Sequence, residues 1–394
     1  MLKTIPHSEQ IFYVGADDKT LDLFESQYPV PDGVSYNAYV IRDEKTALLD
    51  TVDPRATNQW LEQVTEGLDG TAPDYLVISH MEPDHSGSIL CLAERYPEMQ
   101  LVGNAKTFAM LRQFFGADAP SNDRLLEVGE GETLPLGAHT LHFMLAPMVH
   151  WPEVMVAYEE TEKLLFSADA FGRFGALSRT AGAPWAPQAR RYYYNIVGKY
   201  GAQVQALLKK ASALEIETIC PLHGPVLTGG ALGEALRLYD LWSRWQSESP
   251  DDILLAHASI HGNTARAAEL FKQKLEAKGA RVTLCDLTTT EVSYAVANAF
   301  YCGKLVLACS TYDGGLFPPM EEFLSHLQAK GFRSRTVGLM ENGSWAPAAA
   351  RLMRAKLEEM KDLRVCGTVV SLRSALSPAS EAQIDALTTE LCAK

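Results

Sequence analysis

The sequence predicts an α/β protein built from two domains, and three observations support this fold class. The chain has 394 residues, which exceeds the length at which a single hydrophobic core is usual. Strand-like and helix-like segments alternate regularly after about residue 250, whereas short β-rich runs with occasional helices precede that point. A polar stretch at 247–251, which contains Pro250, separates the two patterns. We therefore expect domains at residues 1–250 and 251–394.

The first domain begins with β-rich sequence. The runs at 35–41 and 46–50 are short, apolar and separated by charged residues, a pattern typical of a sheet meander. A helix is expected after Asp53-Pro54, because Asp is a common N-cap and Pro is tolerated in the first turn. The apolar run at 75–78 predicts a buried strand.

The second domain shows regular alternation of strands and helices. We expect strands at 253–258, 281–285, 304–309, 335–340 and 365–371 and helices at 264–278, 291–300, 318–330, 347–361 and 379–392. Such alternation predicts a doubly wound parallel sheet with helices on both faces.

Composition excludes several classes of protein. Hydrophobic residues make up 47% of the chain and charged residues 21%, as in ordinary globular proteins. A net charge of -14 argues against a nucleic-acid partner, because few basic side chains are free to neutralise phosphates. The chain contains no long apolar stretch and no signal-peptide pattern, so we expect no membrane segment and a cytoplasmic location. The seven cysteines lack C-x-x-C spacing, which disfavours a thiolate metal centre or a disulfide framework.

Four potential metal ligands follow the strand predicted at 75–78. They are His80, Glu82, Asp84 and His85, and burying them without a cation would be costly. Zinc hydrolases of the metallo-β-lactamase type carry a second His where this chain has Glu82. A carboxylate is a harder ligand than imidazole, so the block favours iron or manganese over zinc and predicts a redox metal.

Three further ligand-type residues follow strand-like runs. His150 follows the run at 141–146, Asp169 follows 163–167 and His223 follows 218–221. If these strands share one sheet end, seven ligand-type side chains converge there. Seven donors exceed the need of one tetrahedral ion, so two metals are expected, and a carboxylate such as Asp169 can bridge them. Isolated histidines such as His139 and His142 are instead expected to be ordinary strand or loop residues.

Three loops at carboxyl ends of predicted strands in the second domain are rich in hydroxyl groups and glycine. The loop at 259–264 opens a helix, so its backbone N–H groups and hydroxyls can bind a phosphate, although such turns also serve only as helix caps. The loops at 310–315 and 341–346 add Tyr312 and Trp345, which can contact a flat ring.

The whole chain resembles the flavodiiron proteins. The resemblance rests on four motifs that occur in the family's order: His80-Met81-Glu82-Pro83-Asp84-His85-Ser86-Gly87-Ser88, His150-Trp151-Pro152, Leu165-Phe166-Ser167-Ala168-Asp169-Ala170-Phe171-Gly172 and Pro221-Leu222-His223-Gly224-Pro225. It implies a metallo-β-lactamase-like αββα sandwich followed by a flavodoxin-like doubly wound sheet.

The resemblance also implies a non-heme diiron centre. His80, Glu82 and His150 would bind one iron, Asp84, His85 and His223 would bind the other, and Asp169 would bridge them. It leaves open whether His85 binds iron, because in some relatives water takes the place of the matching His.

The second cofactor implied by the resemblance is FMN. Its expected contacts come from the three hydroxyl-rich loops: Ser259, Ile260, His261, Gly262, Asn263, Thr264, Thr311, Tyr312, Asp313, Gly314, Gly315, Asn342, Gly343, Ser344 and Trp345. The third loop departs from the family's Tyr-Gly-Trp pattern, which weakens the assignment of its ring contacts, including that of Trp345.

The activity implied by the resemblance is that of an oxidoreductase. Electrons would pass through FMN to the diiron site, which would reduce O2 to water, NO to N2O, or both. The chain resembles the shortest, A-type architecture and carries no rubredoxin-like domain, so we expect a rubredoxin-like or other small donor protein. The family also implies a head-to-tail homodimer, which can assemble further into a tetramer.

Two alternatives come from other classes of protein. One is a zinc-dependent hydrolase of the metallo-β-lactamase type fused to an electron-transfer flavodoxin domain. The other is an electron carrier whose first domain is only a scaffold. Metal analysis separates them, because the first would contain zinc and the second FMN alone.

Overall fold

The computed structural model describes residues 3–6 and 8–393. The chain divides into two compact units, Met1–Asp240 and Leu241–Lys394, so the division falls within helix α7 (Gly229–Ser243). The domain boundary expected at residue 250 stays a prediction. No helix among the described residues is long and apolar enough to cross a membrane.

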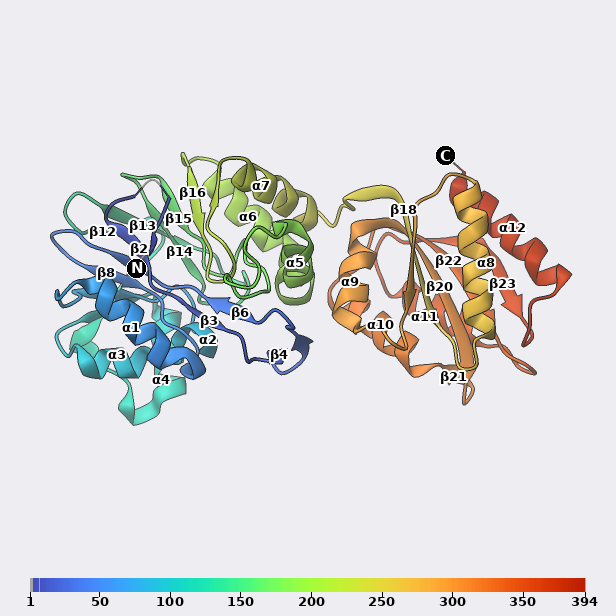
Figure 1. Cartoon of the computed structure of the whole chain (residues 1–394), viewed down its shortest axis with the longest axis horizontal. Coiled ribbons are helices and arrows are strands. Elements are labelled where there is room, and N and C mark those ends of the chain that lie inside the picture. Colours follow the sequence, from blue (N-terminus) through green and yellow to red (C-terminus); the bar gives the residue numbers. More distant parts are fainter. Residues whose placement is uncertain (1–2, 7, 394) are drawn as a thin grey trace. The chain divides into compact units, whose positions relative to one another are not determined.

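The first unit is built on two large sheets packed face to face, with helices on both outer sides (Figure 1), and it also contains two two-stranded sheets, β3-β6 and β4-β5. One sheet has the order β1-β2-β7-β8-β9-β10-β11, and the other has the order β12-β13-β14-β15-β16-β17. Apolar side chains from both sheets, such as Val77, Val102, Phe143 and Phe166, form the core between them. This arrangement confirms the αββα sandwich.

The strand bounds of the first unit are as follows: β1 (Lys3–Thr4), β2 (Ile11–Tyr13), β3 (Ala16–Asp18), β4 (Leu23–Phe24), β5 (Tyr28–Pro29), β6 (Val34–Tyr36), β7 (Tyr39–Ile41), β8 (Ala47–Leu49), β9 (Tyr75–Val77), β10 (Gln100–Gly103), β11 (Leu125–Glu127), β12 (Thr133–Pro135), β13 (Thr140–Leu145), β14 (Met155–Glu159), β15 (Leu164–Phe166), β16 (Thr218–Cys220) and β17 (Leu227–Thr228). Its other helices are α1 (Thr57–Leu68), α2 (Pro83–Ser86), α3 (Ile89–Arg95), α4 (Ala105–Phe115), α5 (Trp185–Tyr192) and α6 (Gly201–Ala211). A π-helical turn over Tyr193–Val197 extends α5.

The helix expected after Asp53-Pro54 is present. The side chain of Asp53 accepts a hydrogen bond from Arg55 N at 2.8 Å, and Pro54 opens a 3₁₀ turn that leads into α1. An acidic N-cap followed by proline therefore begins this helix as the sequence predicts.

The run at 35–41 differs from the single strand suggested by its composition. It divides into β6 and β7, which belong to different sheets. Between them, Asn37 N donates to Leu222 O at 2.8 Å, and the Asn37 side-chain amide donates to Pro221 O and Gly224 O. The chain leaves the sheet here because the polar groups of Asn37 bind the loop that carries His223.

The second unit is a parallel five-stranded sheet with the order β19-β18-β20-β22-β23. Its strands are β18 (Ser249–Ala258), β19 (Val282–Asp286), β20 (Cys302–Tyr312), β22 (Thr336–Asn342) and β23 (Arg364–Leu372), and the short β21 (Gly315–Leu316) pairs back onto β20. Its helices are α8 (Asn263–Ala277), α9 (Val292–Tyr301), α10 (Pro318–Ala329), α11 (Ala349–Glu358) and α12 (Pro378–Cys392).

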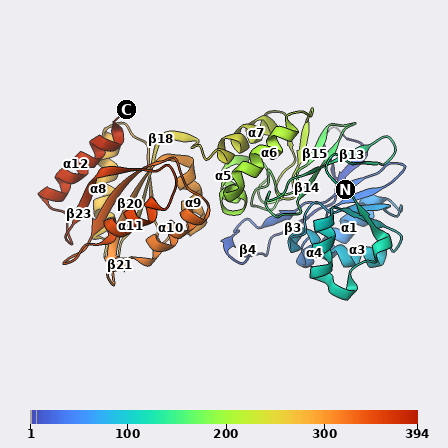
Figure 2. The same ribbon diagram turned by 180° about the vertical axis from the view of Figure 1, so that it is seen from behind.

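Helices cover both faces of this sheet. Figures 1 and 2 show α8 and α12 on one face and α9, α10 and α11 on the other. All five predicted strands and all five predicted helices are present, with ends shifted by a few residues, so the doubly wound fold is confirmed. In such a fold the strand order reverses beside the first strand, which places a ligand crevice at the carboxyl ends of β18 and β20.

Candidate functional site

All seven predicted metal ligands lie in segments that follow strands of the first unit. His80 and Glu82 follow β9, and Asp84 and His85 lie in the single turn of α2. The other three, His150, Asp169 and His223, lie in the loops after β13, β15 and β16. The structure brings these side chains together in two groups, His80/Glu82/His150/Asp169 and Asp84/His85/His223.

The first group surrounds one oxygen of Asp169. Asp169 Oδ2 lies 3.3 Å from His80 Nε2 and 3.1 Å from His150 Nε2. Glu82 Oε2 lies 3.2 Å from His80 Nε2 and 3.1 Å from His150 Nε2. Two imidazoles and two carboxylates therefore direct donor atoms toward a common point.

The second group faces the other oxygen of Asp169. Asp169 Oδ1 lies 3.3 Å from His85 Nε2 and 3.7 Å from His223 Nε2. Asp84 Oδ2 lies 3.4 Å from His85 Nε2 and 3.2 Å from His223 Nε2. Asp169 thus divides its two oxygens between the groups, which is the geometry that a bridging carboxylate requires.

The donor set fits a pair of cations. Asp169 is 1% exposed, yet its Oδ1 has no hydrogen-bond partner among the residues that the structure describes. The same holds for both carboxylate oxygens of Asp84, which is also buried. Buried carboxylate oxygens without donors are costly unless a cation binds them. Mixed imidazole and carboxylate ligands suit iron or manganese.

Electrostatic interactions lower the pKa of Asp169 and of Glu82. Burial opposes charge on His150, but hydrogen bonds to Asp169 and Glu82 outweigh it and raise the pKa of His150 to about 9. Burial would also raise the pKa of Asp169, but the charge of His80, the hydrogen bond with His150 and the charge of nearby His85 hold it well below its usual range. A bound cation would supply the same positive charge, and ligands must be deprotonated to bind it.

Two supporting contacts were not found from the sequence. The carboxylate of Glu153 lies 2.8 Å from His80 Nδ1, and the backbone oxygen of Ser35 lies 2.7 Å from His223 Nδ1. Glu153 could have been noticed as an acid three residues after His150. Ser35 could not have been found, because a backbone oxygen carries no sequence signal.

Aromatic rings enclose the site on two sides. The ring of His223 contacts Phe24, Tyr36 and Tyr192, with centroids 5.4, 6.1 and 5.5 Å away. Tyr192 is 1% exposed, and its hydroxyl has no hydrogen-bond partner among the described residues. On the other side, the ring of Trp151 meets that of His80 edge-on at 5.1 Å. These rings exclude bulk water from the cluster.

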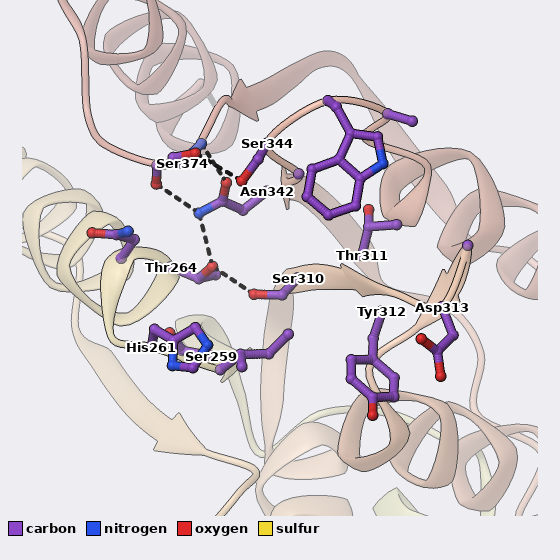
Figure 3. Close-up of a pocket in the computed structure, with 16 residues that line it drawn as sticks. Ser259, His261, Thr264, Ser310, Thr311, Tyr312, Asp313, Asn342, Ser344 and Ser374 are labelled. Atoms are coloured by element: carbon purple, nitrogen blue, oxygen red, sulfur yellow. Dashed lines mark hydrogen bonds between the residues drawn. The ribbon is translucent and has the colours of Figure 1, made fainter.

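The second unit carries a cavity of about 530 Å³ at the carboxyl ends of β18, β20 and β22 (Figure 3). Thirteen of the fifteen side chains or backbone segments predicted to contact FMN line it: Ser259, Ile260, His261, Asn263, Thr264, Thr311, Tyr312, Asp313, Gly314, Asn342, Gly343, Ser344 and Trp345. Ser310, Ala346 and Ser374 also line it and were missed. The contact of the thirteen predicted residues with FMN stays a prediction.

Two of the predicted contacts do not line the cavity. Gly262 adopts a φ of 85° immediately before α8 and so shapes the loop without reaching the cavity. Gly315 pairs with Tyr312 between the antiparallel strands β20 and β21, so its backbone is engaged in strand pairing. Both glycines therefore act on the loop conformation.

Hydrogen bonds join the loops of the cavity (Figure 3). Asn342 Nδ2 donates to Thr264 Oγ1 and to Ser374 O, and Asn342 Oδ1 accepts from Ser374 N. Thr264 Oγ1 in turn lies 2.9 Å from Ser310 Oγ. These bonds fix four strand ends relative to one another. At the rim, Trp345 is 87% exposed and Tyr312 is 45% exposed.

Comparison with known proteins gives matches over the first unit and over the whole chain. The profile of the ODP family beta lactamase matches residues 34–224. The Flavo-diiron protein FprA2 of Clostridium acetobutylicum is 26% identical over 375 residues, which are 91% of this chain and 92% of that protein. The anaerobic nitric oxide reductase flavorubredoxin of Vibrio vulnificus is 27% identical over 367 residues, which are 90% of this chain and 73% of that protein.

A solved structure shares the fold of both units. The rubredoxin oxygen:oxidoreductase of the anaerobe Desulfovibrio gigas superimposes with a TM-score of 0.90 at 24% sequence identity. The superposition covers 99% of this chain and 98% of that chain. The metallo-β-lactamase-like and flavodoxin-like folds expected from the sequence are thus both confirmed.

Proposed function

The chain belongs to the flavodiiron proteins, and from this premise we propose that it is an oxidoreductase that uses FMN and a diiron centre to reduce O2 to water, NO to N2O, or both. The observation that carries this proposal is the division of the two Asp169 oxygens between the two donor groups. A single metal ion would not need a carboxylate divided in this way, whereas two neighbouring metal ions need such a bridging carboxylate.

The ligands of each iron follow from the two groups. We assign His80, Glu82 and His150 to one iron and Asp84, His85 and His223 to the other, with Asp169 between them. When bound, the iron pair would supply electrons and open coordination positions for a diatomic gas, and FMN would supply one- and two-electron transfer. Glu82, a carboxylate where zinc hydrolases of this fold carry His, favours iron and disfavours the hydrolase alternative.

The residues around the cluster affect how protons reach the reacting gas and how polar its surroundings are. Reduction of O2 to water consumes four protons with four electrons, and coupling of two NO molecules to N2O and water consumes two protons with two electrons. Burial raises the pKa of Tyr192 well above its usual range, so its hydroxyl stays protonated and can donate a hydrogen bond toward the cluster. The buried rings of Phe24 and Tyr36 pack against His223 and give the cluster an apolar wall on that side.

The expected FMN contacts form the second half of the proposal. The loop at 259–264 lies at the start of α8, where backbone N–H groups favour a phosphate. Thr311 Oγ1 accepts hydrogen bonds from Ala348 N and Ala349 N, so its own proton remains to be donated into the cavity.

The electron donor, the assembly and the location are finer parts of the proposal. We propose a rubredoxin-like donor and a head-to-tail homodimer, in which the FMN of one subunit serves the diiron centre of the other. Exposed aromatic rings support a partner at both cofactor sites: Trp345 beside the cavity, and Phe114, which is 46% exposed and stacks on Trp151. We also keep the expected cytoplasmic location, which cell fractionation tests.

The test is anaerobic reduction followed by addition of gas. Protein loaded with iron and FMN is reduced by rubredoxin, and the consumption of O2 and of NO is measured in parallel. Sustained consumption of either gas supports the proposal, and the ratio of the two rates identifies the preferred substrate. A zinc-containing protein that consumes neither gas would contradict it.

A further inference from the structure

Glu153 makes a buried contact with the back of His80. Its Oε1 lies 2.8 Å from His80 Nδ1 and also accepts a hydrogen bond from Met81 N at 2.9 Å. The side chains of Glu153 and His80 are both 0% exposed. The Oε2 atom of Glu153 has no hydrogen-bond partner among the described residues. The charge of this carboxylate is therefore directed almost entirely at His80 and the backbone beside it.

The backbone around Glu153 is held in place. Asn104 Nδ2 donates to Glu153 O at 2.6 Å, while Asn104 Oδ1 caps α4 by accepting from Lys106 N and Thr107 N. The carboxylate thus projects from a fixed segment and cannot follow a displaced ring without breaking these bonds.

The second group of ligands has no such support. His223 Nδ1 faces a neutral acceptor, the backbone oxygen of Ser35. His85 is 0% exposed, and its Nδ1 has no hydrogen-bond partner among the described residues. Among the described residues, a carboxylate therefore hydrogen-bonds to Nδ1 of His80 but to Nδ1 of neither histidine of the second group, since the buried Asp50 lies near His85 without a hydrogen bond to its ring.

We propose that Glu153 is a positioning residue that holds His80 with Nε2 turned to the cluster and makes the two metal positions unequal. The inference rests on the proposed diiron function and deepens it. A ring that donates its Nδ1 proton to a carboxylate has a fixed tautomer and a more basic Nε2. The position bound by His80, Glu82 and His150 is then the more electron-rich one. It holds its ion more tightly and has the lower reduction potential.

The test compares three variants loaded anaerobically with Fe²⁺. Glu153→Gln keeps the shape of the side chain and removes its charge, whereas Glu153→Asp keeps the charge and shortens the side chain. Glu159→Gln is the matched control, because Glu159 is a buried acid at the far end of β14 whose side chain, among the described residues, accepts hydrogen bonds from Thr161 N and Glu162 N and contacts no metal ligand. Iron loss to a Fe²⁺ chelator and the midpoint potential of each iron are measured for each variant and for the wild type.

The expected result for Glu153→Gln is selective. One of the two iron equivalents should dissociate roughly 10- to 100-fold more readily, as for other outer-shell partners, and its potential should rise. The second equivalent should behave as in the wild type. Glu153→Asp should recover part of the loss, and Glu159→Gln should change neither quantity even if it lowers the melting temperature.

Other outcomes overturn the inference. Wild-type retention and potential of both irons in Glu153→Gln would show that the carboxylate is a packing residue. Equal loss of both irons, matched by Glu159→Gln, would show general destabilisation. If Glu153→Gln does not fold, Glu153→Asp decides alone, because wild-type values for both irons would then contradict the inference. None of these measurements needs gas turnover, so a failure here is distinct from a failure of the proposed activity.

Discussion

The Nε2 atoms of His85 and His223 lie 3.0 Å apart. Two unprotonated imidazole nitrogens at this distance would direct lone pairs at each other, so a proton or a cation must lie between or beside them. Asp84 Oδ2 lies within 3.4 Å of both nitrogens, and the backbone oxygen of His85 accepts hydrogen bonds from the hydroxyl and the backbone N of Thr51. The geometry supports His85 as a ligand of the second metal, in place of water.

The role of His85 can be tested by His85→Ala. Removal of the ring leaves Asp84 and His223 as the unshared ligands of the second metal, so we expect the iron content to fall by about one equivalent per chain. Iron and FMN per chain are measured after anaerobic loading. His142→Ala is the control, because His142 lies away from the cluster, is half-buried and hydrogen-bonds to Glu160. Retention of two irons with unchanged affinity would mean that water serves equally well.

Tyr192→Phe tests the hydroxyl beside His223. The substitution keeps the buried ring and removes the oxygen, so both irons and FMN should remain bound. We expect turnover to fall by about 100-fold, the effect typical of one preorganised donor. Gas consumption under saturating donor measures this. Tyr158→Phe is the control, because its hydroxyl donates to Glu215 O. Unchanged turnover in Tyr192→Phe would remove Tyr192 from the mechanism.

Asn342→Ala tests the hydrogen bonds that join the cavity loops. The side chain of Asn342 connects Thr264 with the backbone of Ser374, so its loss should leave the loops less well ordered for FMN. Each lost hydrogen bond is worth about 1 kcal/mol, and we expect about half of the combined loss, roughly 1.4 kcal/mol, to fall on the FMN complex, which is a roughly tenfold weaker FMN affinity. Fluorescence titration of the FMN-free protein measures this. The exposed Asn122→Ala in the first unit should bind FMN like the wild type.

A pH-dependent contact lies away from the metal ligands, at His139. Its Nδ1 lies 2.7 Å from Asp43 Oδ2, and its Nε2 lies 3.4 Å from Glu162 Oε1. Burial opposes charge on His139, but the hydrogen bonds to both carboxylates outweigh it and raise its pKa. The resulting stabilisation is complete below the unfolded value of about 6.5 and is lost as the pH rises through the higher folded pKa.

His139→Gln should therefore lower the melting temperature at pH 5.5 and have a much smaller effect at pH 9. The pKa of Asp43 is lowered by its hydrogen bonds with His139 despite partial burial, so its contribution to stability is complete above the unfolded value of about 3.9 and is lost as the pH falls through the lower folded pKa. Thermal unfolding of the metal-free protein at several pH values measures both effects. An equal loss at pH 5.5 and pH 9 would contradict an ionic origin.

Most of the fold follows from local sequence pattern. Apolar runs such as 75–78 and 304–309 mark buried strands, and ligand-type residues directly after such runs lie at strand ends. That is why the convergence of His80, His150 and His223 could be expected before the structure was known.

The parts that could not be predicted depend on long-range contacts. Asn37 binds the 221–224 loop more than 180 positions away, and this contact divides β6 from β7. Ser374 follows β23 and lines the cavity. Its backbone has a φ of 69°, which the local sequence does not indicate. Glu153 stabilises His80 from another loop. Such contacts are set by tertiary packing, which a local pattern does not encode.

The central claim is that two irons lie on opposite sides of the Asp169 carboxylate, and a crystal grown from iron-loaded protein tests it most directly. Diffraction data collected above and below the iron absorption edge should give two anomalous peaks, one near Asp169 Oδ2 with His80 and His150, the other near Asp169 Oδ1 with His85 and His223. A single peak, or peaks that appear only at the zinc edge, would contradict the account.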